Sequence, residues 1–379
     1  MRIPKESLSG EDIRQPVEEL LITHLKKLDK QGYKCDGRLV ANILVGAAIH
    51  GRTIESVCAD LTVGVESNTA RQYLKAQLKV SDLREQEAAM NQCLSDCLPA
   101  ALPRSSCEMA LDCHDEPFYG KMPALRAYAC RGEAKEGTTH FYRVASLYVM
   151  WRQVRFTLAL TYVLPEEALE TVVRRLLTRM TTLGFHPKAL YMAKGFCTGT
   201  ILTYLQQNHI PAVLACPIRG KKGGIRALCK GRSAYTTDYT FTDGTAVRLA
   251  LVPTRPLDKN GKRRVKWLAY VLIHLDWSAT TCYQRYRRRF GIESSYRQLD
   301  DVRARTSSRN PALRFLLLAL GFILLNVWIY LRFAATRVIE RGPARWFPHL
   351  FQLPRFIAFL RRALERFYGT HDEIAVYSV

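Results

Sequence analysis

No Cys-x-x-Cys pair occurs in the sequence, although it contains 11 cysteines. Cys93 and Cys97 are four residues apart, a spacing that on a helix only places both on one face. A structural zinc site would need a second close pair of ligands, and the sequence has none. The cysteine count is also odd. We therefore interpret the cysteines as structural thiols, which is consistent with a reducing cytosol.

Segments that would direct the chain to a membrane are missing or weak. The start, MRIPKESLSGED, has no apolar run, so we expect no signal peptide. One charge-free stretch of 17 residues, 315–331, reaches the lower limit for spanning a bilayer. It contains Gly321 and Asn326 and has no counterpart elsewhere, which favours a buried core helix. The alternative is a membrane-associated protein anchored by this stretch, which solubility without detergent would exclude.

Acidic residues are scarce. The 34 Asp and Glu residues are outnumbered by 56 Lys and Arg residues, which leaves a formal net charge of +22. The 379 residues suffice for two or three domains, and 48% hydrophobic residues indicate a globular chain rather than a disordered polycation. A folded protein this basic is expected to bind a polyanion. Nucleic acid is a better candidate than a membrane surface.

Residues 11–82 carry apolar residues at the three-to-four spacing typical of helices. One short helix can begin at Thr53, and a second can be capped by Ser67 or Asn68 beyond a turn at Gly64. Such a pair is typical of a helix-turn-helix, although an ordinary helical hairpin has the same spacing. The basic residues of this segment are Arg71, Lys75 and Lys79.

The middle of the chain changes to an α/β pattern. Three strand-like runs rich in β-branched and aromatic residues come first, over 107–120, 139–151 and 155–164. A helix, a strand, a helix and a strand follow, over 165–184, 188–193, 199–208 and 210–218. This order predicts a mixed sheet flanked by helices.

Residues 219–281 then alternate strand-like pieces with basic loops, and helices return from 282 to about 367. This pattern indicates a β-rich insertion. We divide the chain into five parts: an N-terminal helical DNA-binding region (1–100), the first part of the core (101–218), the insertion (219–281), the second part of the core (282–335) and a C-terminal helical tail (336–379).

Two acidic residues stand in patterns that favour catalysis. Asp112 ends an apolar strand, where the rim of a sheet leaves room for substrate, although many such residues only hydrogen-bond a turn. Glu293 lies one helical turn from both Arg289 and Arg297. An exposed ion-pair ladder would explain this spacing. The many Arg and Tyr residues around Glu293 favour instead a site that holds DNA phosphates beside a metal ion.

Three segments, LDCHDEPFYGK, LYMAKGF and RYRRRFGIESSYRQ followed by RARTSS, resemble the DDE transposases of the IS4 superfamily, ISH3-like group. The resemblance covers about residues 105–335. It implies a ribonuclease-H-like core, interrupted by a β-rich insertion, in which Asp, Asp and Glu bind two Mg²⁺ ions that Mn²⁺ can replace. By this resemblance, Asp112 and Glu293 are catalytic residues and metal ligands.

The sequence departs from the family's pattern in two places. Tyr286, Arg289 and Glu293 match the start of Y-x2-R-x3-E-x6-K, but Asp300 occupies the Lys position. More seriously, Ala193 stands where the family has its second Asp. The family's sequence at the end of this strand resembles L-L-D-R-G-F, and the matching sequence here is L-Y-M-A-K-G-F.

A methyl group cannot replace a carboxylate ligand of Mg²⁺. We therefore predict that this chain is inactive, or nearly so, but still binds DNA. Because the surrounding motif is intact, an engineered Asp→Ala change is favoured over natural decay.

The resemblance also implies the partners. We expect a homodimer on double-stranded DNA, at transposon ends and target, in the prokaryotic cytoplasm with the nucleoid and without a membrane. Trp267 or Trp277 is a candidate for stacking a flipped base, with a core tryptophan as the alternative. The expected DNA contacts are Tyr286, Arg289, Arg297, Arg288, Lys194, Arg303, Lys221, Lys222, Arg71 and Lys75.

The predicted function is that of an insertion-sequence transposase, which cuts and pastes DNA at terminal inverted repeats by a two-metal mechanism. One alternative is a domesticated or decayed transposase that acts only as a DNA-binding protein. A structure-specific nuclease is another.

Overall fold

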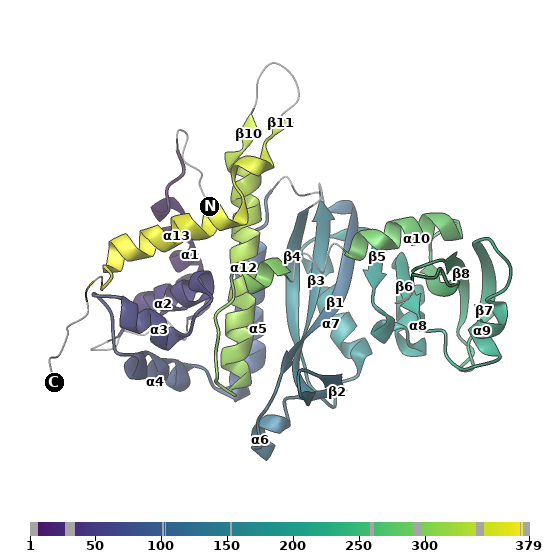
Figure 1. Cartoon of the computed structure of the whole chain (residues 1–379), viewed down its shortest axis with the longest axis horizontal. Coiled ribbons are helices and arrows are strands. Elements are labelled where there is room, and N and C mark those ends of the chain that lie inside the picture. The colour runs from purple at the N-terminus through teal and green to yellow at the C-terminus, as the bar shows by residue number, and fades with distance from the viewer. Residues whose placement is uncertain are drawn as a thin grey trace.

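The computed structural model describes residues 7–26, 35–100, 102, 104–151, 154–257, 261–290, 297–338, 345–371 and 373. It is an α/β structure in which a group of helices lies beside a large mixed sheet (Figure 1). The long helix α12 (Pro311–Ala335) and α5 (Leu83–Asp96) stand between that helical group and the strands. The prediction of a mixed sheet flanked by helices is confirmed.

The N-terminal part contains α1 (Glu11–His24), α2 (Gly37–His50), α3 (Ile54–Asp60) and α4 (Ser67–Gln77), and a short 3-10 turn, η1 (Val80–Asp82), leads into α5. The two short helices expected after Thr53 are α3 and α4. The Thr53 side chain caps α3 by accepting a hydrogen bond from the backbone N–H of Ser56. The expected cap of α4 is wrong, because Ser67 is already its first residue and Glu66 occupies the N-cap without a side-chain bond.

Within the described residues, nine strands form one sheet in the order β2-β3-β1-β5-β6-β9-β8-β7, with β4 also paired to β3. The expected strands of the α/β segment are present as β1 (Ser105–Pro117), β3 (Thr138–Trp151), β4 (Val154–Val163), β5 (His186–Met192) and β6 (Ala212–Cys216). The sequence analysis missed β2 (Cys130–Lys135) and the short helix α6 (Pro123–Arg126).

Residues 219–281 are rich in strands, as expected. They contain α9 (Gly224–Leu228), β7 (Tyr235–Thr240), β8 (Ala246–Thr254) and β9 (Lys266–Ile273). Since β9 pairs with β6 and β8 with β9, both antiparallel, these strands extend the central sheet rather than forming a second one. The boundaries of the five parts of the chain stay a prediction.

Helices cover both faces of the sheet. On one face, α7 (Leu169–Thr182) packs on β3 and β4, and α8 (Gly199–Gln207) packs on α7 and β9. The other face carries α10 (Ala279–Arg287), whose Tyr286 packs on Tyr191 and Tyr270. Leu190 and Met192, the neighbours of Tyr191, belong to the main core instead, as the two-residue period of a strand requires.

The apolar stretch 315–331 lies inside α12. Of the most apolar 18-residue window of α12, 89% is buried in the fold, so the prediction of a core helix is confirmed. Asn326 is buried and bonds the N–H and C=O of Thr157 on the outer edge of β4, at 2.9 and 2.8 Å. Asn91 of α5 likewise forms hydrogen bonds with the N–H and C=O of Leu160. Side-chain amides thus satisfy the backbone of an edge strand where another strand is missing.

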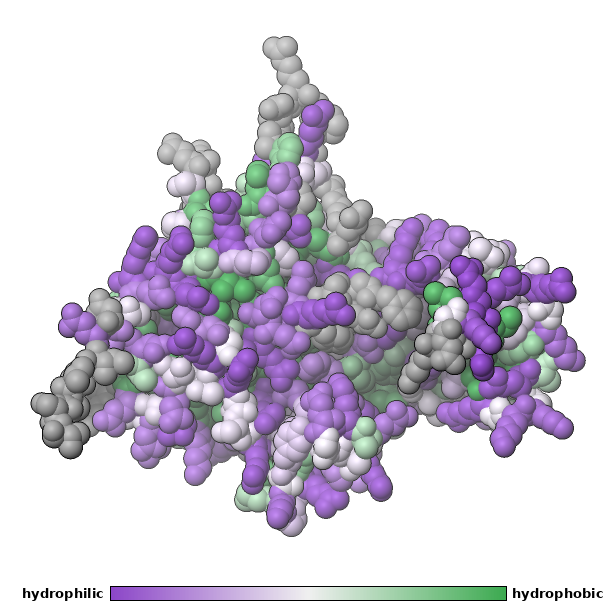
Figure 2. Space-filling view, in the orientation of Figure 1, coloured by the Kyte–Doolittle hydropathy of each residue, from purple (hydrophilic) through white to green (hydrophobic). Residues whose placement is uncertain are grey.

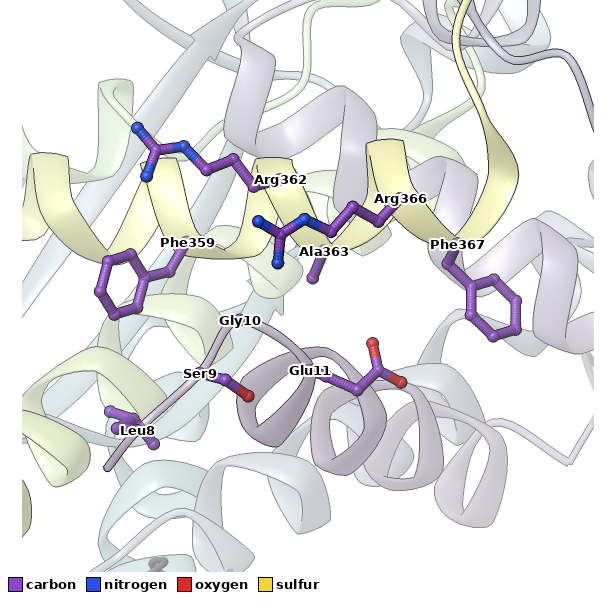
Figure 3. Close-up of a pocket in the computed structure, with 9 residues that line it drawn as sticks. All are labelled: Leu8, Ser9, Gly10, Glu11, Phe359, Arg362, Ala363, Arg366 and Phe367. Atoms are coloured by element: carbon purple, nitrogen blue, oxygen red, sulfur yellow. The ribbon is translucent and has the colours of Figure 1, made fainter. Parts of the chain in front are cut away.

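The C-terminal part returns to the N-terminal helices. After a two-stranded hairpin, β10 (Arg337–Val338) and β11 (Arg345–Trp346), and a 3-10 turn, η4 (Pro348–Leu350), α13 (Leu353–Tyr368) packs on α1 and α2. Figure 3 shows α13 passing over the start of α1, with Gly10 beneath it. A pocket of about 460 Å³ lies there. It is lined by Leu8, Ser9, Gly10, Glu11, Phe359, Arg362, Ala363, Arg366 and Phe367.

Candidate functional site

Asp112 lies in the middle of β1, so the expectation that it ends a strand is wrong. The strand continues in antiparallel pairing with β3 as far as Pro117 opposite Phe141. Its parallel pairing with β5, however, stops at Leu111 opposite Met192. Asp112 is therefore the first residue of β1 at which β5 no longer covers the strand edge. The open position that the sequence analysis expected at the end of β1 is present, but it arises because β5 ends there.

Ala193 follows directly after Met192, the last residue of β5. The register therefore brings position 193 next to Asp112, at the open edge. Asp112 lies two residues beyond Ala110, the partner of Tyr191, and so shares the face of the sheet that carries Tyr191. Ala193 lies past the end of β5 and packs against the main core. The two positions that the resemblance pairs are thus neighbours in the fold, and their catalytic role stays a prediction.

Arg289 contacts Asp112 and Tyr286. It belongs to a 3-10 turn, η3 (Arg288–Phe290), that continues α10. Its Nη2 donates to Oδ2 of Asp112 at 2.8 Å, and its Nη1 donates to the Tyr286 hydroxyl at 3.3 Å. The Tyr286 hydroxyl in turn donates to the carbonyl oxygen of Met192 at 3.0 Å. One chain of hydrogen bonds therefore links β1, η3, α10 and the end of β5.

Burial shifts the pKa values of two groups in this chain of hydrogen bonds. It raises the pKa of Tyr286 to about 12, so the phenol keeps its proton at neutral pH and can donate to Met192. Burial also raises the pKa of Asp112, and the neighbouring Arg289 guanidinium opposes that shift.

Other polar residues share the Asp112 face of β1. Glu108 lies 3.6 Å from both Arg285 and Arg288. At the other end, Glu116 is 4% exposed and pairs with Arg303 at 2.7 Å and Arg314 at 3.5 Å. We call Glu108, Asp112, His114 and Glu116 the acidic row. The sequence analysis missed Glu108 and Glu116 as paired residues, although alternation along CEMALDCHDEP places all four on one face.

His114, between Asp112 and Glu116 in the row, contacts Arg303 through its Nε2 at 3.3 Å. Burial, and secondarily the charge of Arg303, lowers the pKa of His114 to about 4. The imidazole is therefore neutral at neutral pH.

Three of the expected DNA contacts lie beside carboxylates of the acidic row, although the Arg288 side chain is itself 67% exposed. Arg288, Arg289 and Arg303 each pair with a carboxylate of β1. Arg297 and Lys194 are exposed, and Lys194 directly follows Ala193. The remaining expected contacts lie on other elements and are exposed: Lys221 and Lys222 before α9, and Arg71 and Lys75 on α4. Hydrophilic side chains cover most of the face seen in Figure 2.

The two tryptophans considered for base stacking are both half-buried. Trp267 packs edge-on against Tyr235, with ring centroids 6.3 Å apart. Trp277 is covered by the guanidinium of Arg285 at 4.5 Å, next to Glu108. Each ring is thus partly covered by one neighbouring side chain.

The described residues do not fit a two-ion Mg²⁺ site. Among them, no group of three or more His, Cys, Asp and Glu side chains is arranged to hold a metal ion. Oδ2 of Asp112 accepts from Arg289, and its Oδ1 accepts from the backbone N–H of Cys113. Ala193 adds no ligand. Glu293, the remaining expected ligand, lies outside the described residues.

Comparison with known proteins identifies the fold. No protein-family model and no curated protein matches the sequence. Among solved structures, the chain is similar to a piggyBac transposase, determined by cryo-electron microscopy as a synaptic complex with hairpin DNA. The likeness has a TM-score of 0.60 at 10% sequence identity, and it covers 94% of this chain and 80% of that one. At this identity the likeness concerns the fold, and the chain has a fold similar to that of a transposase.

Proposed function

We propose that this chain is a DDE-type DNA transposase of an insertion sequence, of the IS4 superfamily, that binds its DNA but does not cut it as given. The observation that carries the proposal is the adjacency of Asp112 on β1 and Ala193 after β5, in a fold similar to that of a transposase. The strand order β4-β3-β1-β5-β6, in which only β3 runs against the others, supports a ribonuclease-H-like core.

The charges at the site support the loss of cutting. With Ala at position 193, Asp112 is the one described carboxylate directly beside that position, and the Arg289 guanidinium already neutralises it at 2.8 Å. An Asp at position 193 would add a second carboxylate beside Asp112. Two adjacent acids then carry more negative charge than one guanidinium compensates, which is the condition under which a divalent cation binds.

DNA binding does not need that metal. Phosphates are attracted by basic side chains wherever they are exposed, and the net charge of +22 supplies the long-range attraction. Lys194 beside the open edge and the lysines before α9 are the residues we expect to contact the backbone. We propose double-stranded DNA as the partner, a homodimer as the bound form and the prokaryotic nucleoid as the location.

The test compares the chain with its Ala193→Asp variant on DNA that carries the ends of the element, in Mg²⁺ and in Mn²⁺. Ala193→Asn is the matched control, since it has the same shape without the charge. We expect all three proteins to bind and only the Asp variant to cut. If the Asp variant binds the DNA but does not cut it in either metal, the catalytic assignment is wrong.

One observation favours a second function, that of a transposase-derived protein that only binds DNA. Three arginines expected to hold phosphates are engaged with the acidic row, and the Asp112–Arg289 pair fills the place of a metal ligand. This function predicts that no residue at position 193 restores cutting, while removal of exposed lysines weakens binding. The same comparison of variants therefore separates the two functions.

A further inference from the structure

A second cavity lies between the helix-turn-helix candidate and the segment that leads into α12. It has a volume of about 370 Å³. Three sets of side chains line it: apolar, cationic and hydroxyl or amide. The lining residues are Thr53, Ile54, Glu55, Arg71, Leu74, Lys75, Leu78, Arg305, Thr306, Ser307, Ser308, Asn310 and Leu313.

The apolar lining is buried and the cationic lining is exposed. Ile54, Leu74 and Leu78 are 6%, 2% and 6% exposed, so they form the inner wall. Arg71, Lys75 and Arg305 are exposed and surround the opening. The cavity therefore offers an apolar wall and a positively charged entrance, which suits a ligand with one apolar part and one anionic part.

The cations at the entrance are not neutralised by acids of the lining. Glu55 is the one acidic residue there, and it lies 4.0 Å from Arg71, with both side chains more than half exposed. An ion pair of that kind is weak. Among the described residues, no ion pair is recorded for Lys75 or Arg305, so this entrance retains an excess of positive charge.

The hydroxyls in the lining retain donors. The Thr306 hydroxyl accepts from the N–H of Ser308, and the Ser308 hydroxyl accepts from the N–H of Asn310, at 3.0 and 3.2 Å. Each hydroxyl still has its own hydrogen to donate. Phosphate oxygens accept hydrogen bonds from donors of this kind when they lie beside cations.

We propose that this cavity binds a nucleoside phosphate, with the base on the apolar wall and the phosphate at Arg71, Lys75 and Arg305. The volume falls within the range of about 300–1,000 Å³ of small-ligand sites. A free nucleotide and the terminal nucleotide of a DNA strand share this chemistry. The proposal does not depend on cutting, because it concerns residues that the acidic row does not include.

The segment that carries Arg305 connects the cavity both to the N-terminal helices and to the sheet. The N–H of Arg305 donates to the carbonyl oxygen of Arg52 at 2.9 Å, ahead of α3. Two residues earlier, Arg303 pairs with Glu116 of β1. A ligand held between α4 and Arg305 therefore ties the helix-turn-helix candidate to the strand that carries Asp112.

The test is calorimetry on the full chain with deoxyadenosine monophosphate, deoxyadenosine and inorganic phosphate. We expect the nucleotide to bind at least tenfold more tightly than deoxyadenosine or inorganic phosphate, because it occupies both the apolar wall and the cationic entrance. Arg305→Gln and Lys75→Gln should each weaken nucleotide binding roughly tenfold, since each removes one charge-assisted hydrogen bond. Lys79→Gln is the matched control, because Lys79 is exposed just beyond α4 and does not line the cavity.

Two results would overturn the proposal: a nucleotide that binds no more tightly than inorganic phosphate, or equal losses in the Lys79→Gln control and the two cavity variants. Competition by a 5′-phosphorylated DNA duplex, but not by its 5′-hydroxyl form, identifies a DNA end as the ligand. Without such competition, the bound nucleotide is the free form. None of these measurements involves cleavage, so failure here leaves the Ala193→Asp result unaffected.

Discussion

Arg289 donates a hydrogen bond to Asp112 at 2.8 Å, across 177 residues of sequence. Both side chains are largely buried, at 13% and 20% exposed, so the pair is shielded from the screening that weakens surface ion pairs. The pair joins β1 to the turn after α10. It also commits the Asp112 carboxylate, beside position 193, to a cation from the protein itself.

A double-mutant cycle on this pair measures how strongly the two charges depend on each other. Arg289→Gln and Asp112→Asn should each lower the free energy of unfolding by about 2 kcal/mol, because each leaves a buried charge without its partner. The double variant should lose about 1–2 kcal/mol less than the sum. Urea unfolding of the four proteins gives the coupling. Additivity within about 0.5 kcal/mol would mean that the contact contributes nothing.

Glu116 is expected to matter more for stability than any other member of the acidic row. It is 4% exposed and holds both Arg303 and Arg314, so Glu116→Gln would leave two guanidiniums without their countercharge. We expect a loss of about 2–4 kcal/mol in urea unfolding. Asp300→Asn is the matched control. Asp300 also lies near Arg303, at 3.9 Å, but is 69% exposed, so its change should stay within about 0.5 kcal/mol. Equal losses would contradict this account.

The sequence predicted the elements of the fold better than their connections. Alternation and apolar runs located β1, β3 and β4 and distinguished α12 from a membrane span, since these signals lie within one segment. The pairing of β9 with β6 has no such local signal. Residues 219–281 could therefore be identified as strand-rich but not as part of the central sheet.

The candidate site, like the fold, was predicted from the sequence only in part. The resemblance placed Asp112 and position 193 together, and the register of β1 and β5 brings them side by side. The sequence did not predict that β1 continues past Asp112, because that depends on β3. Nor could it predict that Arg303 and Arg314 meet Glu116, since 187 and 198 residues separate the partners. Arginines that look like phosphate contacts in a basic segment were thus assigned without their acidic partners.

His114 should make stability fall at mildly acidic pH. Burial, with Arg303 second, lowers the pKa of His114 from its ordinary 6.5 to about 4 in the fold. Between these values the unfolded chain binds a proton that the folded chain does not. The stabilisation is therefore complete above about pH 6.5 and is lost as the pH falls towards about 4, by about 2–3 kcal/mol.

The check is urea unfolding at about pH 7 and about pH 4.5. His114→Gln should reduce the loss between the two pH values, while His186→Gln, on an exposed residue of β5, should lose as much as the parent chain. Part of the loss should remain in both, because burial also lowers the pKa of His50 to about 4. An unchanged loss in His114→Gln would show that this imidazole does not titrate between the two pH values.

Gly10 permits a close approach between the start of α1 and α13. A Cβ at this position would lie 2.1 Å from the carbonyl oxygen of Phe359 in α13, well inside contact distance, and Figure 3 shows Gly10 directly below that helix. The φ of Gly10 is −66°, so an alanine there suffers no backbone strain, and the clash is the whole effect. Gly10→Ala must push α13 away from α1, at a cost of about 1–3 kcal/mol.

The control is Gly195→Ala, because a Cβ at Gly195 meets nothing within 4 Å. Thermal unfolding should show a lower midpoint for Gly10→Ala and little change for Gly195→Ala. The clash is with backbone, which cannot rotate away as a side chain does. Since α13 also packs on α2, a displaced α13 should expose amides of α1 and α2 to hydrogen exchange before those of the sheet. If exchange rises equally in all elements, the contact between α1 and α13 is not a separate unit of stability.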